Sequence, residues 1–331
     1  MLVSACALSA LVALASCTPA TILPGEMLPI AVESSVIDDL GGNPTVAAGL
    51  TFLGGIELSS PEPLFGAFSS IRFRDEKSFL GVFDTGYWIE GRILRDAEGR
   101  LSGVEAVRLA PLLDALGRES RSKFQVDAES LALDGDRGFV GFEQRHRVLA
   151  YAPLSNLGKA LPSDPLAFPF DLDILHSNGG FESLVIAPEG SPVEGALVAI
   201  SEKSFDENGN LYAAIVGGAL TAEFRVRPRD EFEITDATFL PDGDLLLLER
   251  RFSIATGVGM RMRRIEGASI RPDAVVDGEI LFEANYRSQI DNMEGLDAIP
   301  EADGSVRLIV VSDDNHSILQ RSLMLEFRLD N

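Results

Sequence analysis

The sequence predicts an all-β protein, a β-propeller of five or six four-stranded blades preceded by an N-terminal export signal. Short apolar runs alternate with Asp-Gly, Glu-Gly and Pro-Asp-Gly turns, as in β-hairpins. One hairpin pattern recurs along the chain, with an acid at the start of its first strand and another at the end of its second strand. It recurs at intervals of roughly 50–60 residues, near the length of one propeller blade.

The first segment of the chain has the character of a targeting signal. Residues 1–16 are small and apolar and lead into Cys17 through Leu14-Ala15-Ser16, which resembles the lipobox of bacterial lipoproteins. We therefore expect a lipoprotein-type signal peptide over residues 1–16, lipidation of Cys17, and a tether over residues 17–47. A plain secretory signal and an uncleaved segment are the alternatives. Thr18 in place of an aspartate favours anchoring to the outer membrane, facing the periplasm, and secretion to the periplasm is the other expected location.

The composition limits the class of partner. The formal net charge is -23, with 51 Asp and Glu against 28 Lys and Arg. This balance argues against nucleic acid, because phosphate contacts need basic side chains. It is compatible with cation binding or with an acidic surface. If Cys6 leaves with the signal and Cys17 carries lipid, the mature fold has no cysteine nucleophile, disulfide or cysteine-based zinc site. We expect a monomer that meets the membrane only through its lipid.

Residues 48–331 are assigned to the propeller, and five repeats can be followed along them. Their hairpins span residues 68–86, 127–143, 180–202, 235–250 and 292–315, each followed by further strand material. A sixth blade would combine residues 49–58 with residues 272–287. Propellers commonly close their ring by mixing N- and C-terminal strands in one blade. A β-sandwich or two stacked all-β domains are the alternatives, and the even repeat favours the propeller.

The repeat also predicts an acidic opening. The start of the first strand and the end of the second are neighbours in an antiparallel hairpin, and the first strand of each blade lines the channel. Crowded carboxylates repel one another and are relieved by protonation, by arginine partners or by a hard cation such as Ca²⁺ or Mg²⁺. The acids that the repeat gathers are Asp84, Glu129, Glu143, Glu182, Glu202, Asp236, Glu249, Glu294, Asp313 and Asp314. For each acid alone, a solvated turn residue or a partner of a nearby arginine is the alternative.

Four stretches carry a resemblance to a known family. They are Asp127–Leu131 with Glu143, Asn178–Leu184, Leu240–Gly243 ending in Leu248-Glu249-Arg250, and Asn292–Leu296 with Ser312–Asn315. Together they resemble the phytase-like propeller domain, often labelled "esterase-like activity of phytase", over about residues 48–329. The resemblance implies a β-propeller that hydrolyses phosphate or other esters with a metal-activated water. Phe65–Ser70 and Asp84-Thr85-Gly86 depart from the family pattern and weaken the case for metal binding at that blade.

From the acids and the resemblance together we expect a small-molecule ester or phosphoester substrate and bound Ca²⁺. The expected metal ligands are Glu129, Glu182, Glu249, Glu294 and Asp313. Glu143 or His316 is expected to transfer protons, and Arg250 to clamp an anionic substrate. Absence of Gly-x-Ser-x-Gly, His-Glu-x-x-His and P-loop motifs argues against other common hydrolase classes.

Two rival functions stay open. A metal-dependent propeller lactonase would use an overlapping site. A non-catalytic propeller that binds or assembles partners in the cell envelope is favoured by the low density of lysine and arginine, and it would show no turnover.

Overall fold

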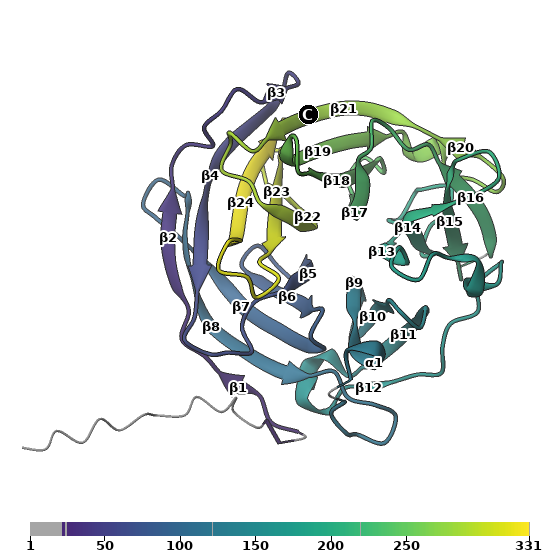
Figure 1. The fold of residues 1–331 in the computed structure, drawn as a ribbon, viewed down its shortest axis with the longest axis horizontal. Coiled ribbons are helices and arrows are strands. Elements are labelled where there is room, and N and C mark those ends of the chain that lie inside the picture. The colour runs from purple at the N-terminus through teal and green to yellow at the C-terminus, as the bar shows by residue number, and fades with distance from the viewer. Residues whose placement is uncertain (1–21, 24, 121, 219, 331) are drawn as a thin grey trace, which may run out of the picture.

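Five sheets, antiparallel except for one short parallel pair, surround a central axis in the computed structural model of the chain (Figure 1). The structure describes residues 22–23, 25–120, 122–218 and 220–330. The predicted all-β propeller is confirmed, with five blades. The expected signal peptide, residues 1–16, and Cys17 lie outside the described residues.

The first two blades follow the chain from the axis outward. Blade 1 contains β5 (Phe68–Phe73), β6 (Ser78–Phe83), β7 (Tyr87–Arg95) and β8 (Leu101–Pro111), with β1 (Leu28–Pro29) at its outer edge. Blade 2 contains β9 (Ala128–Asp134), β10 (Arg137–Phe142), β11 (Arg147–Ala152) and β12 (Leu161–Pro162). The short helix α1 (Lys123–Val126) connects them.

The next two blades each accept a strand from elsewhere in the chain. Blade 3 contains β13 (Phe181–Ile186), β14 (Leu197–Phe205), β15 (Leu211–Val216) and β16 (Ala222–Val226), with β20 (Val275–Val276) parallel to β16. Blade 4 contains β17 (Glu233–Phe239), β18 (Leu245–Ser253), β19 (Gly257–Ile265) and β21 (Gly278–Asn285), with β3 (Thr45–Val46) outermost. In the part of the chain that the structure describes, three 3₁₀ helices lie in connections: η1 (Leu154–Lys159), η2 (Leu172–Ile174) and η3 (Gly267–Ser269). Within the described residues, no helix has the length and apolarity to cross a membrane.

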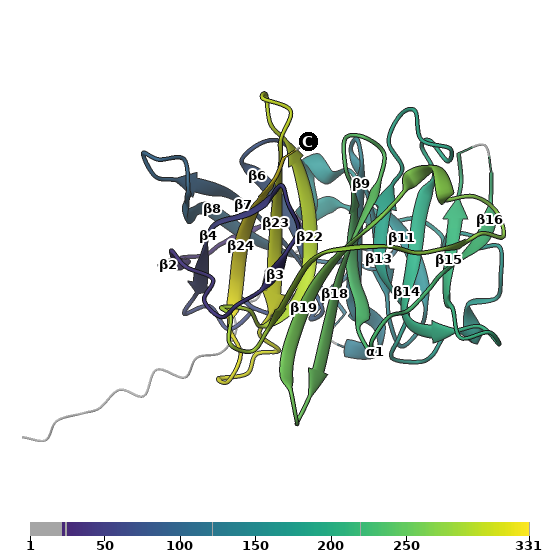
Figure 2. The same ribbon diagram turned by 90° about the horizontal axis from the view of Figure 1, so that it is seen from above.

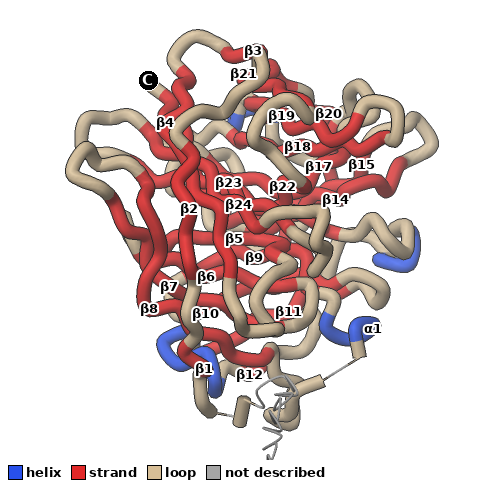
Figure 3. Tube along the Cα trace, turned by 60° about the vertical axis from the view of Figure 1, so that its left-hand side comes forward, coloured by secondary structure: helices blue, strands red, loops and turns tan. Residues whose placement is uncertain are grey.

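Blade 5 closes the ring with strands from both ends of the chain. It contains β22 (Asn292–Pro300), β23 (Val306–Asp313) and β24 (Ser322–Leu329) from the C-terminal side. The N-terminal strands β4 (Leu50–Ser59) and β2 (Glu33–Ile37) complete it, and Figure 3 shows them beside β24. The expected mixing of N- and C-terminal strands is confirmed. The sixth blade is not formed, because residues 50–59 join blade 5 and residues 278–285 join blade 4.

The N-terminal segment differs from the expected tether. Residues 28–46 contribute β1, β2 and β3 to blades 1, 5 and 4, so this part of residues 17–47 belongs to the propeller. Each of these strands pairs with an outer strand whose edge would otherwise present unpaired backbone groups. The chain thereby covers three sheet edges.

The hydrophobic core is divided among the five boundaries between neighbouring blades. Each boundary is filled by buried side chains from the facing sheets. At the boundary between blades 1 and 2, Trp88 is fully buried and meets Tyr151 edge-on, with 5.5 Å between ring centroids. Burying an aromatic side chain of this kind is a major contribution to stability. The inner strands β5, β9, β13, β17 and β22 are thereby fixed around the axis.

The axis itself is closed by a buried ion pair between blades 1 and 4. The guanidinium of Arg72 donates to both carboxylate oxygens of Asp236, at 2.7 and 2.8 Å. It also donates to the backbone carbonyls of Leu184 and Leu296, at 2.9 and 2.7 Å, which belong to blades 3 and 5. Asp236 is therefore buried in the channel, instead of lying at its opening as the sequence pattern predicted. Burial raises the pKa of Asp236, and the charge of Arg72 opposes that rise.

Candidate functional site

A β-bulge recurs near the start of the inner strand in all five blades. In each blade the register skips one residue, which is left without a partner on the second strand. The skipped residues, here called the bulge ring, are Ser69, Glu129, Glu182, Thr235 and Glu294. A bulge bends the strand and re-aims the extra side chain. Ser69, Glu129, Glu182 and Glu294 line the cavity at the channel mouth, whereas Thr235 is buried and donates to the carbonyl of Met293.

A second set of equivalent positions lies beside the bulge ring. These residues, here called the end ring, come at or just after the end of the hydrogen-bonded pairing between the first and second strands: Asp84, Glu143, Glu202, Arg250 and Asp313. All five line the same cavity of about 780 Å³. The structure therefore brings together Glu129, Glu143, Glu182, Arg250, Glu294 and Asp313 as the sequence predicted.

Three cations neutralise the periphery of this acidic mouth. Lys123 pairs with Asp84 at 2.6 Å and with Asp127 at 3.5 Å. Lys203 pairs with Glu202 at 2.8 Å. Arg250 pairs with Glu294 at 2.9 Å and with Glu202 at 3.1 Å. The two lysines were not recognised as site residues from the sequence, because they lie outside the repeated positions.

The central acids of the mouth have no such partner. Among the residues that the structure describes, Glu129, Glu143 and Glu182 form no ion pair within 4.0 Å. Carboxylate oxygens of Asp127, Glu129 and Glu143 lie within 4.8 Å of one another, as do those of Glu143, Glu182 and Glu202. Glu143 belongs to both groups and is the centre of the arrangement. Asp127 is buried, and its Oδ1 has no hydrogen-bond partner within the described structure.

The crowding changes the proton affinity of these acids. Burial raises the pKa of Glu143 to about 7, and the neighbouring carboxylates of Asp127 and Glu202 add to the shift. Burial likewise raises the pKa values of Glu129 and Glu182 well above the usual range, with further contributions from adjacent acids. A carboxylate that is buried beside other carboxylates is costly to ionise unless a cation joins it.

Two further acids on the blade 5 side show the same effect. Burial raises the pKa of Glu294 to about 8, although the charge of Arg250 acts in the opposite direction. Burial raises the pKa of Asp313 to about 7, while a hydrogen bond from the backbone N–H of Asn315 at 2.6 Å opposes the rise. At neutral pH these groups are poised between their charged and neutral forms.

The donor set at the mouth fits a hard cation. It consists of carboxylate oxygens from several strands. The buried Oδ1 of Asp127 has no hydrogen-bond partner and lies 3.5 Å from the Lys123 ammonium, and Glu143 at the centre has no ion pair in the described structure. Calcium prefers oxygen ligands of this type and tolerates irregular geometry. The expected role for Ca²⁺ is therefore compatible with the residues that are present.

The acids predict an unusual pH dependence for the stability of the metal-free protein. Because the folded-state pKa values of Glu143, Asp313 and Glu294, about 7, 7 and 8, exceed those of unfolded carboxylates, the folded protein binds more protons. Stability should be greatest below the unfolded pKa values and fall as pH rises through the folded ones. Each net pKa unit corresponds to about 1.4 kcal/mol, so the melting temperature should fall by about 2 °C or more between pH 5 and pH 8.

Thermal unfolding in EDTA and in CaCl₂ at pH 5, 6.5 and 8 checks this expectation. Added Ca²⁺ should restore the melting temperature at pH 8 and have little effect at pH 5, since it binds the ionised carboxylates. A melting temperature that rises with pH in EDTA would contradict the predicted sign.

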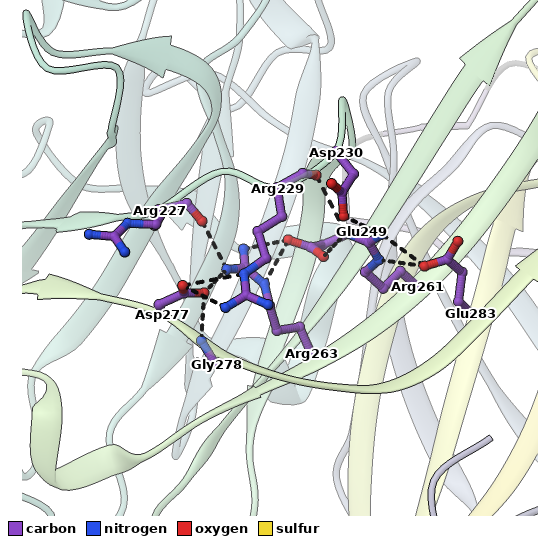
Figure 4. Close-up of polar contacts among 9 residues, drawn as sticks. All are labelled: Arg227, Arg229, Asp230, Glu249, Arg261, Arg263, Asp277, Gly278 and Glu283. Carbon is purple, nitrogen blue, oxygen red and sulfur yellow. Dashed lines mark hydrogen bonds and ion pairs between the residues drawn. The ribbon is translucent and has the colours of Figure 1, made fainter. Parts of the chain in front are cut away.

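Glu249 was expected to be a metal ligand, and the structure places it away from the mouth. It is a fully buried residue of β18, and it accepts a hydrogen bond from Nε of Arg263 on β19 at 3.0 Å (Figure 4). Arg263 also pairs with Asp277 at 2.8 Å. Successive residues of a strand point to opposite faces, so Arg250 reaches the cavity and Glu249 cannot. Burial raises the pKa of Glu249, and the arginines act in the opposite direction.

His316 was expected to transfer protons, and it does not line the cavity. It is an exposed residue of the connection between β23 and β24, and its side chain lies close to Gly66, which precedes β5. Its neighbours Asn315 and Ser317 face the cavity instead. Glu143 is therefore the member of the predicted pair that the fold positions among the acids.

The fold and the acidic mouth define this chain as a five-bladed β-propeller with a carboxylate-lined cavity at one end of a closed axis. The chain belongs to the family described as "Phytase-like: Esterase-like activity of phytase", whose model matches residues 63–316. The predicted family membership is confirmed.

Solved structures and curated proteins add the following similarities. An α-L-arabinofuranosidase from Podospora anserina, in complex with cellotriose, is 13% identical, with coverage of 92% of this chain and 98% of that chain and a TM-score of 0.44. A glucose dehydrogenase-type oxidoreductase from Thermus thermophilus is 12% identical, with coverage of 83% of this chain and 99% of that chain and a TM-score of 0.40. Neither likeness bears on activity. No curated protein matches the sequence.

Proposed function

We propose that the protein is an exported, metal-dependent hydrolase of phosphate or other esters that acts at the channel mouth. The observation that supports this is the cluster of Glu129, Glu143 and Glu182, which line an open cavity without ion-pair partners in the described structure. A surface that served only solubility would have no need to bury acids together at a free-energy cost. Location in the cell envelope through lipidation of Cys17 is part of the proposal and rests on the sequence.

The residues that would hold Ca²⁺ are Asp127, Glu129 and Glu182, which flank Glu143. A bound ion would offset the charge of the acids and of the substrate and polarise the ester. Arg250 is held by Glu202 and Glu294, so its charge is already balanced within the protein. Its predicted role as a clamp for an anionic substrate would require it to exchange one of these partners.

Glu143 is the group that accepts the proton of the attacking water in this proposal. The water oxygen forms a bond to phosphorus or to the acyl carbon, and the bond to the alcohol oxygen breaks. Glu143 takes a proton from the water and then passes it to the leaving alcohol oxygen, so that Glu143 is regenerated and one water is consumed for each ester. A carboxyl group with a pKa of about 7 is suited to both transfers near neutral pH.

Hydrolysis of p-nitrophenyl phosphate, p-nitrophenyl acetate and a γ-lactone, each in CaCl₂ and in EDTA, tests the proposal. We expect Ca²⁺-dependent turnover of a phosphate or acyl ester; turnover of the lactone alone would favour the lactonase. Glu129→Gln and Glu182→Gln should lower turnover and weaken the stabilisation by Ca²⁺, because each removes a ligand charge. Glu266→Gln, on an exposed acid outside the cavity lining, is the matched control. A protein that binds Ca²⁺ but turns over no ester would favour the envelope-binding function.

A further inference from the structure

The cavity at the mouth has an apolar wall as well as an acidic one. Phe252, Val258 and Leu319 line the same cavity as the acids. They come from the β18–β19 hairpin and from the connection between β23 and β24, which project from the same edge of the ring (Figure 2). The central acids Glu129, Glu143 and Glu182 belong to blades 2 and 3, whereas these apolar residues belong to blades 4 and 5.

The apolar wall is open to solvent to an unusual degree. Phe252 is 65% exposed and Leu319 is 87% exposed. On the same two loops, Ile254 is 98% exposed and Ile318 is fully exposed. Single exposed hydrophobic residues are common, but a group of them at the rim of a cavity marks a surface that another apolar group covers.

The charges that line the cavity restrict the polar part of a ligand whose apolar part covers this wall. In the part of the chain that the structure describes, the lysines and arginines lining the cavity are Lys123, Lys203 and Arg250, and each is paired with acids. A substrate with several phosphates would find no unpaired cation among them and would face the full set of carboxylates. One ester group, balanced by one bound cation, is compatible with this mouth.

We propose that the substrate is amphiphilic, with a single phosphate or carboxylate ester joined to an extended apolar chain. The ester lies by Glu143, and the apolar chain lies on Phe252, Val258 and Leu319 and continues over Ile254 and Ile318. This assignment rests on the proposed function, because it places the reacting ester at the same acids. The occupant of the apolar wall is the substrate itself, since that wall and the acids share one continuous cavity.

Two homologous series test the assignment. They are p-nitrophenyl acyl esters from acetate to octanoate and monoalkyl phosphates from ethyl to octyl, each below its critical micelle concentration in CaCl₂. In the productive series kcat/KM should rise between about two- and fourfold per added methylene, the upper figure applying to full burial. The double variant Phe252→Ser with Leu319→Ser should flatten this dependence, so that turnover of the longest ester falls much more than turnover of the shortest one. Val36→Ser changes an exposed residue of the outer strand β2, away from the cavity, and should retain the dependence of kcat/KM on chain length.

Binding of alkylphosphonates, measured by calorimetry in CaCl₂, separates the two proposals. Octylphosphonate that binds more tightly than ethylphosphonate, with the difference lost in the double variant, supports the amphiphilic ligand even if no ester is hydrolysed. In that case the hydrolase function alone would fail. Equal turnover of short and long esters together with equal binding of both phosphonates would overturn the amphiphilic assignment. The proposed hydrolase function would still be supported. Preferred turnover of an inositol hexakisphosphate over every monoester would overturn it as well.

Discussion

Replacing Arg72 with methionine is expected to lower the free energy of unfolding by about 3–5 kcal/mol, as for other buried ion pairs that lose one partner. The substitution leaves Asp236, which is fully buried, without its counter-charge. It also removes the donors that the carbonyls of Leu184 and Leu296 share at the axis. Urea-induced unfolding, followed by fluorescence or circular dichroism, measures the change.

A matched substitution at an exposed ion pair shows how much of the loss in stability comes from the burial of the Arg72 pair and how much from removing any paired arginine. Arg92 forms an ion pair with Glu105 at 3.8 Å, and both side chains are about half exposed. Arg92→Met should therefore cost less than about 1 kcal/mol. Arg72→Met combined with Asp236→Asn should regain part of the loss, because the unpaired charge is gone while an oxygen still accepts from the N–H of Leu296. A cost for Arg72→Met no larger than that of the control would show that the axis does not depend on this pair.

Replacing Glu143 with glutamine is expected to lower kcat by about 10²–10⁴-fold, the usual contribution of a positioned proton acceptor. Glutamine has nearly the same shape but cannot accept the proton of the attacking water. The substitution does not alter the proposed Ca²⁺ ligands Asp127, Glu129 and Glu182. Stabilisation of the fold by Ca²⁺ should therefore persist. Steady-state kinetics and a Ca²⁺ titration of the melting temperature on the same variant provide both measurements.

The control for this variant lies in the same hairpin. Asp134 is at the opposite end of β9, where it is exposed and paired with Arg137, so Asp134→Asn should change neither quantity. If Glu143→Gln instead abolished the effect of Ca²⁺ on stability, Glu143 would be a metal ligand. The proton acceptor would then have to be sought elsewhere in the end ring, with Asp313 the first candidate.

The repeat in the sequence was sufficient to predict the propeller and the gathering of acids at one opening. Hairpin geometry alone places Glu129 beside Glu143, and it places Glu294 beside Asp313. The same reasoning was wrong for Glu249. The strand Leu245–Leu248 is uniformly apolar, so it has no alternation to show which faces Glu249 and Arg250 take. The pairing register places Arg250, and not Glu249, at the position equivalent to Glu143 and Glu202.

Other features depend on contacts between distant segments and leave only a weak trace in the sequence. The strands β1 and β3 have two residues each, too few to show periodicity, so the segment around them was interpreted as a tether. Arg72 stands between Ile71 and Phe73 in an apolar inner strand, an unusual position that could have marked a buried partner. The identity of that partner, Asp236, emerges only when blades 1 and 4 meet at the axis.

The closure of blade 5 by strands from both ends of the chain has a consequence for the order of events during synthesis. Strand β4 is synthesised before the inner strands of blades 1 to 4, and its partner β24 is synthesised after them. Until β24 is available, β4 and β2 have no sheet to join, and the ring stays open with the inner faces of its flanking blades uncovered. The topology therefore keeps blade 5 incomplete until blades 1 to 4 have been synthesised, and the uncovered apolar faces need protection from aggregation in that interval.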